Sequence, residues 1–138
     1  MTTQLIILCI PLALLPIVAL GLRPLFDVFL REGAQMFGHF PLRKRISVVT
    51  SRPLAWINAS VFAATWVATF GCHFIGLPHL VWTWLPAAGL VAALVLSIRV
   101  VEDRVGIAGH RAWLIGLLAF AGGNLPFFLI VPAALAVA

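Results

Sequence analysis

The sequence predicts an all-α integral membrane protein with four transmembrane helices and both termini outside. Of its 138 residues, 63% are hydrophobic and only 9% are charged, and the mean hydropathy is +1.14. A soluble domain of this length could not bury that much apolar surface. Four apolar stretches are also about as long as the roughly 20 residues that a helix needs to cross a bilayer. We expect residues 1–138 to form one polytopic membrane domain.

A helical hairpin is the centre of this prediction. Its two apolar runs, residues 54–75 and 80–101, are joined by a Gly-Leu-Pro-His segment that begins at Gly76. Glycine and proline between two such runs mark a turn. The two runs are therefore predicted to be the second and third membrane spans.

The outer two spans carry helix-weakening residues. The first span, 3–22, contains Pro11 and Pro16, which predict a bent helix because proline removes a backbone hydrogen bond. The fourth span covers residues 112–137. Before the hairpin, basic and proline residues from 41–45 and 52–53 bracket a short predicted loop.

Residues 25–40 have a different pattern, which predicts an amphipathic helix at the membrane interface or packed under the bundle. Polar residues recur every four positions, at Asp27, Arg31, Gln35 and His39. The other side collects Phe26, Phe29, Leu30, Met36, Phe37 and Phe40. The spacing and order of Asp27 and Arg31 also predict an ion pair within the helix.

The distribution of basic residues predicts the orientation. All nine Lys and Arg residues lie in or beside the first-to-second and third-to-fourth connections. The positive-inside rule places both connections in the cytoplasm, here of a bacterial inner membrane. Trp56 and Trp113 fall near this face, as interfacial aromatic belts do. Topology explains the net positive charge, so no nucleic-acid partner is predicted; the lipid bilayer is the first partner.

Two stripes of small residues predict how the hairpin packs. One comprises Ser60, Ala64 and Ala68, and the other comprises Gly89, Ala93 and Ser97. Small residues at four-residue spacing let two helix backbones approach closely. We therefore expect the second and third spans to touch through these stripes.

No catalytic residues and no metal site are predicted. Nothing resembles a nucleophile beside a histidine and a carboxylate, and Cys9 and Cys72 match no zinc or redox spacing and are expected to be free thiols. His73, in the outer half of its span, is the candidate ligand for a haem or chlorophyll-type cofactor. The alternative, which we favour, is a polar interfacial histidine, so no cofactor is firmly implied.

Residues 122–126 interrupt the fourth span. Gly122 and Gly123 weaken the helix, Pro126 removes a backbone bond, and Asn124 places an amide near the middle of the membrane. Broken helices can form ion or substrate sites. A proline kink whose free carbonyls are met by Asn124 or a neighbouring helix needs no ligand. Asn58, in the second span, is expected to hydrogen-bond another helix.

Four spans, external termini and a basic first cytoplasmic loop resemble the membrane proteins of glutathione and eicosanoid metabolism. The arginine and asparagine at the start of that family's second helix would fall around Arg52 and Asn58. The glutamate that follows them in the family is missing here, and the chain has no tyrosine. The resemblance implies a transferase that holds an anionic cosubstrate such as glutathione on a patch of Arg43, Lys44, Arg45 and Arg52. Independently of the resemblance, the position of these cations beside the spans makes the patch a candidate site for lipid headgroups.

The leading functional hypothesis is a small, non-catalytic accessory subunit of a larger membrane complex, such as a respiratory or photosynthetic one. The spans contain no Asp, Glu or Lys at bilayer depth, whereas proton-coupled transporters generally need an intramembrane acid or base. Other membrane subunits are the expected partners. The alternatives are the membrane transferase and a small uncoupled channel or carrier built around the broken fourth span.

Overall fold

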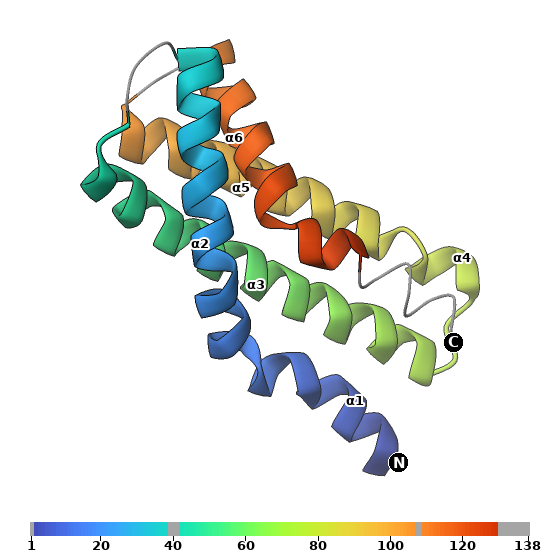
Figure 1. The fold of residues 1–138 in the computed structure, drawn as a ribbon. Helices are drawn as coiled ribbons and strands as arrows, with labels where there is room; N and C mark the ends of the chain where they lie inside the picture. The colour runs from blue at the N-terminus through green and yellow to red at the C-terminus, as the bar shows by residue number, and fades with distance from the viewer. Residues whose placement is uncertain (1, 39–41, 107–108, 130–138) are drawn as a thin grey trace.

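The computed structural model describes residues 2–38, 42–106 and 109–129, of which 90% are helical and none lies in a strand. The elements are α1 (Thr2–Ala13), α2 (Leu15–Gly33), the π-helical turn η1 (Ala34–Gly38), α3 (Lys44–Phe74), α4 (His79–Trp82), α5 (Leu85–Val105) and α6 (His110–Gly123). Helices α3 and α5 lie side by side, while α2 crosses α3 and packs against α6 (Figure 1). The all-α prediction is confirmed.

Two helical segments are long and apolar enough to cross a membrane. They are Lys44–Phe74 and His79–Val105, which cover the two predicted spans of the hairpin apart from Ile75. Helices α1 and α2 add a third only if they are taken as one span bent by 42°. The fourth predicted span, 112–137, is described only as far as residue 129, and α6 ends at Gly123. The described residues therefore supply two to three candidate spans.

The predicted hairpin turn is present. Gly76 has a φ of 83°, a left-handed conformation that glycine adopts without steric cost. The short α4 and a bend at Thr83 and Trp84 follow before α5 begins. At the other end, α3 starts at Lys44, so the predicted loop before residue 54 is helix instead. One face of these additional turns packs into the bundle, where Ser47, Thr50 and Ser51 are fully buried. A buried segment needs its backbone groups hydrogen-bonded, and a helix provides those bonds.

The boundary predicted between the first span, 3–22, and the helix over 25–40, at Arg23 and Pro24, is wrong. Helix α2 continues through both residues, and residues 25–38 belong to α2 and η1 rather than to a separate interfacial helix; residues 39–40 lie outside the described residues. The predicted bend of the first span is present at Leu14, between Pro11 and Pro16. Pro24 is exposed, so its ring lies away from the packed face, and α2 tolerates the loss of one backbone donor.

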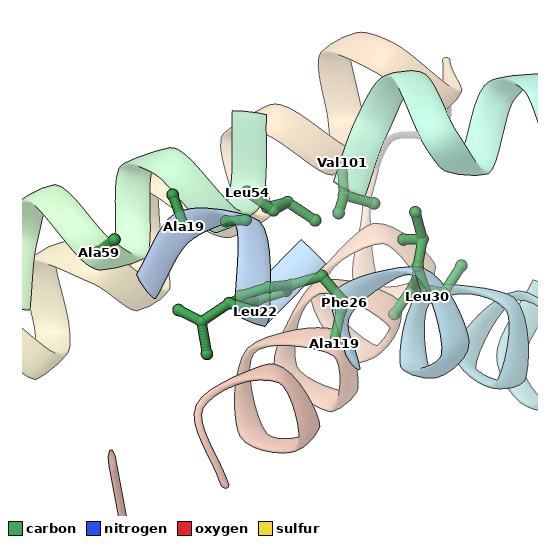
Figure 2. Close-up of a cluster of buried hydrophobic side chains, with 10 residues drawn as sticks. Ala19, Leu22, Phe26, Leu30, Leu54, Ala59, Val101 and Ala119 are labelled. Atoms are coloured by element: carbon green, nitrogen blue, oxygen red, sulfur yellow. The ribbon is translucent and has the colours of Figure 1, made fainter. Parts of the chain in front are cut away.

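The apolar face of α2 forms the centre of the core. Phe26 and Leu30 are both 0% exposed, and the buried positions of α2 recur every three or four residues, as on one face of a helix. The core comprises Ala19, Leu22, Phe26 and Leu30 of α2, Leu54, Ala55 and Ala59 of α3, Val101 of α5, and Ile115 and Ala119 of α6 (Figure 2). The amphipathic pattern therefore marks an interior helix face.

The contact between α3 and α5 uses one of the two predicted stripes. On α5, Ser97 hydrogen-bonds α3, Ala93 is buried, and a Cβ at Gly89 would lie 2.2 Å from Oγ1 of Thr65. On α3, however, the predicted residues Ser60, Ala64 and Ala68 are all exposed. This half of the prediction is corrected: Asn58 and Thr65 face α5 instead, and the Ser60–Ala64–Ala68 stripe is turned away from it by the 100° rotation per helical residue.

Candidate functional site

A buried hydrogen-bond network joins α3, α5 and the end of α6. Asn58 is 2%, Ser97 0% and Asn124 5% exposed. Nδ2 of Asn58 donates to Oγ of Ser97 at 3.0 Å, and Nδ2 of Asn124 donates to Oδ1 of Asn58 at 2.9 Å. The prediction that Asn58 bonds another helix is confirmed by its bond to Ser97 of α5. Its second bond, from Asn124 at the end of α6, was not predicted.

Both amides of this network use all their donor hydrogens within the protein. The second hydrogen of Asn58 Nδ2 goes to the carbonyl oxygen of Leu54 at 2.8 Å, and that of Asn124 Nδ2 goes to the carbonyl oxygen of Phe120 at 2.9 Å. A side-chain amide has only two N–H donors. The arrangement therefore holds three helices in register, and it leaves no amide donor for a ligand.

The break at residues 122–126 is explained by packing. A Cβ at Gly122 would lie 2.1 Å from the Phe29 ring, and one at Gly123 would lie 2.4 Å from the Phe26 ring. The two glycines thus let aromatic rings of α2 rest on the backbone of α6. Asn124, the next residue, ends α6 and enters the buried network. The contacts of Gly122, Gly123 and Asn124 in the described residues are therefore all made within the protein.

A second polar cluster joins α2 to the start of α3. Arg31 Nη2 lies 3.4 Å from Asp27 Oδ2, which confirms the predicted ion pair. The Ser47 hydroxyl donates to the Asp27 carboxylate, and Arg31 Nε donates to Ser47 Oγ at 3.3 Å. Sequence reasoning missed Ser47, because its partners lie on another helix. Thr50, one turn further along α3, is fully buried, and its hydroxyl has no partner among the described residues.

The histidines lie apart from both clusters. His73 is exposed and packs edge-on against Trp82, with ring centroids 5.2 Å apart. His79, which follows the turn, also packs edge-on against this indole, with ring centroids 4.9 Å apart. His110 is exposed at the start of α6, and His39 lies outside the described residues. Within the described part of the chain, no group of three or more His, Cys, Asp or Glu side chains is placed to hold a metal ion. Cys9 and Cys72 are free thiols.

An aromatic ladder along α3 anchors α1. Neighbouring rings of Phe62, Trp66, Phe70 and Phe74 have centroids 6.0, 4.6 and 5.9 Å apart. Nε1 of Trp66 donates to the carbonyl oxygen of Ile7 at 2.9 Å. In a regular helix that carbonyl would accept from the residue four positions later, which is Pro11 and has no N–H. Trp66 therefore supplies the donor that the proline lacks.

We expect Trp66→Phe to lower the free energy of unfolding by about 0.5–1.5 kcal/mol, the usual net value of one hydrogen bond. Unfolding in a neutral detergent, followed by circular dichroism, measures the change. In a Pro11→Ala background the new backbone N–H can serve the Ile7 carbonyl, so Trp66→Phe should cost less there. Equal costs in the two backgrounds would show that the indole bond does not replace the missing donor.

The small residues that pack the core lie on two stripes other than the predicted Ser60–Ala64–Ala68 stripe. Ala55, Ala59 and Ala63 are buried along α3, and Ala112, Gly116, Ala119 and Gly123 are buried along α6. Gly116 brings α6 onto α5, since a Cβ there would lie 2.9 Å from Cγ1 of Ile98. Their spacing of three or four residues was the available signal. The α3 stripe runs beside the exposed one, and periodicity alone cannot choose between the two.

The predicted anion patch lies on the surface. Arg43, Lys44, Arg45 and Arg52 are all exposed on α3 or just before it, and none of them forms an ion pair within the described residues. No protein-family model, curated protein or solved structure matches the chain. The fold and its contacts define an all-helical protein that is consistent with a membrane protein and has a tightly bonded interior. Its function must be inferred from the surfaces that this interior leaves uncovered.

Proposed function

We propose that this protein is a small, non-catalytic accessory subunit of a larger membrane complex in the bacterial cytoplasmic membrane. The observation that carries the proposal is the Ser60–Ala64–Ala68 stripe of α3. It has the spacing of a helix-packing surface, yet the described residues of the chain leave it exposed. The proposed location follows from the charge asymmetry and the two to three apolar helices.

The composition of the stripe favours a helix over lipid as its neighbour. Lipid solvates bulky aliphatic side chains as well as small ones, so small residues gain little by facing it. Between helices, small residues allow close backbone approach and therefore more van der Waals contact. Gly71, beyond the stripe on α3, also has open space where a Cβ would project. An additional transmembrane helix from another subunit fits this surface.

The amino-terminal helix supports the same conclusion. In α1 only Pro11 is buried, and Leu5, Ile6 and Ile10 are 60%, 56% and 45% exposed. Figure 1 shows α1 extending away from the crossing of α2 and α3. A helix with so little contact to its own bundle gains stability by packing against a neighbour.

The two alternatives find less support in the same contacts. The transferase hypothesis needs Asn58 near a cosubstrate, whereas Asn58 is buried and fully hydrogen-bonded. The carrier hypothesis needs an accessible break at residues 122–126, whereas the rings of Phe26 and Phe29 rest on its two glycines.

The test introduces bulk on the stripe. Ala64→Leu should reduce co-purification of partner subunits from native membranes at least tenfold, because the leucine holds the partner backbone away. The isolated chain should unfold within about 0.5 kcal/mol of the parent, as exposed substitutions usually do. Val91→Leu is the matched control, since Val91 is 59% exposed on α5 and lies outside the stripe.

Either of two results would contradict the proposal. One is purification of the chain without larger subunits under mild detergent. The other is equal loss of partners in the Ala64→Leu and Val91→Leu variants, which would mean that added bulk anywhere weakens the assembly. A homo-oligomer that binds glutathione and reacts it with an electrophile would instead establish the transferase hypothesis.

A further inference from the structure

The fold gathers most of the positive charge at one end of the molecule. The first turns of α3, the last turns of α5 and the first turn of α6 all lie toward the end of the molecule opposite α4 (Figure 1). Seven exposed cations lie there: Arg43, Lys44, Arg45, Arg52, Arg99, Arg104 and Arg111. Within the described residues the single ion pair is between Asp27 and Arg31, so these seven are uncompensated by direct contact. We call them the basic rim.

Apolar side chains are interleaved with the rim. Arg45, Val49, Arg52 and Trp56 are exposed at successive spacings of four, three and four residues, which places them on one face of α3. The residues opposite them, including Ser47 and Leu54, are buried. Such a face offers cations and apolar groups to the same surroundings, as helices do where they pass from hydrocarbon to headgroups.

The register of α3 against α5 places aromatic and cationic groups at matching depth. Trp56 precedes Asn58 by two residues, and Arg99 follows Ser97 by two. Because Asn58 and Ser97 are hydrogen-bonded and the helices are antiparallel, Trp56 and Arg99 lie at about the same level. On α6, Trp113 is 57% exposed and follows the exposed Arg111 by two residues, on another side of the helix. The basic rim therefore extends over three helices and is not one compact patch.

We propose that the basic rim binds the phosphate headgroups of anionic phospholipids, retaining them in preference to zwitterionic ones. This inference rests on the proposed membrane location but does not depend on the accessory role. A soluble anion would need cations converging on an enclosed pocket. Here they are spread over three helices, and the depression beside Arg99 is shallow, open and also lined by Glu102 and Asp103.

The experiment titrates the purified full-length chain, in a neutral detergent, with phosphatidylglycerol or phosphatidylcholine. Thermal unfolding gives the apparent affinity, and native mass spectrometry counts the lipids retained. We expect phosphatidylglycerol to bind at least tenfold more tightly, because each cation near an anionic lipid surface contributes a few-fold in affinity. The preference should weaken as salt concentration rises, through charge screening.

Two charge variants identify the residues responsible. The triple variant Arg45→Gln, Arg52→Gln and Arg99→Gln should lose at least about tenfold of the preference for phosphatidylglycerol, a few-fold for each cation removed, while the four remaining cations of the rim keep the rest. The matched Arg45→Lys, Arg52→Lys and Arg99→Lys variant should keep the preference, since its charge is unchanged. All three positions are exposed, so lipid-free unfolding temperatures should match the parent, and this measurement separates lost binding from lost folding.

Equal affinity for the two lipids, or an unchanged preference in the glutamine variant, would overturn the inference. Displacement of phosphatidylglycerol by an equal concentration of inorganic phosphate would also overturn it, by showing a site for a free anion. Alkaline extraction of native membranes tests the location separately. If the chain leaves the membrane, the location is refuted; if it stays without a lipid preference, only the rim proposal fails.

Discussion

Gly123→Ala is expected to destabilise the protein by about 1–3 kcal/mol, the usual cost of overpacking a filled core. The added Cβ would lie 2.4 Å from Cε1 of Phe26, and Phe26 is 0% exposed, so its ring has no free space to move into. Thermal unfolding in one neutral detergent, compared with the parent protein, measures the loss.

Gly21→Ala is the matched control for this substitution. It lies in α2, and nothing is within 4 Å of the position where its Cβ would be built. Alanine should leave stability unchanged or raise it by up to about 1 kcal/mol, through better helix propensity. Adding Phe26→Leu to Gly123→Ala should recover part of the loss. Equal unfolding temperatures for Gly123→Ala and Gly21→Ala would refute the packing of α6 on α2.

Asn58→Ala should cost about 1–3 kcal/mol, because the Asn124 amide and the Ser97 hydroxyl would each lose a partner while buried. A double-mutant cycle with Asn124→Ala isolates the bond between the two amides. Because the two amides are bonded at 2.9 Å, the second substitution should cost less in the presence of the first. Strictly additive losses would argue against it.

Ser60→Ala provides the comparison on the same helix. Ser60 is exposed two residues from Asn58, so its substitution should change stability by no more than about 0.5 kcal/mol. A loss equal to that of Asn58→Ala would show that removing any polar side chain from α3 destabilises the protein, irrespective of the network.

The candidate site was predictable in part. Asn58 could be identified because an amide in an apolar run must find hydrogen-bond partners, and the pair Asp27 and Arg31 because both lie on one helix at four-residue spacing. Ser97, Asn124 and Ser47 are joined to these residues by bonds between helices. Their pairing depends on how the helices cross, which no local pattern contains.

Asn58 was also the available guide to the rotation of α3. Two small-residue stripes run along this helix, at 55, 59, 63 and at 60, 64, 68, and each has the spacing of a packing surface. A buried amide fixes which side of α3 faces the other helices. With Asn58 on that side, Ala59 and Thr65 are favoured over Ala64 as contact residues. The prediction of the Ser60–Ala64–Ala68 stripe rests on small-residue spacing, which does not contain this polar constraint, and it is therefore wrong for the contact with α5.

The sequence by itself determined the all-α class, the hairpin turn at Gly76 and the two apolar runs that this turn joins, because these depend on neighbours within a few residues and on transfer to an apolar medium. The tertiary structure decided the role of residues 25–38. Their amphipathic pattern suits a membrane interface and a protein interior equally, since both offer one apolar side. Gly122 and Gly123 of α6 decide between these two roles, because only residues without a side chain leave room for the rings of Phe26 and Phe29. This contact places the helix in the core.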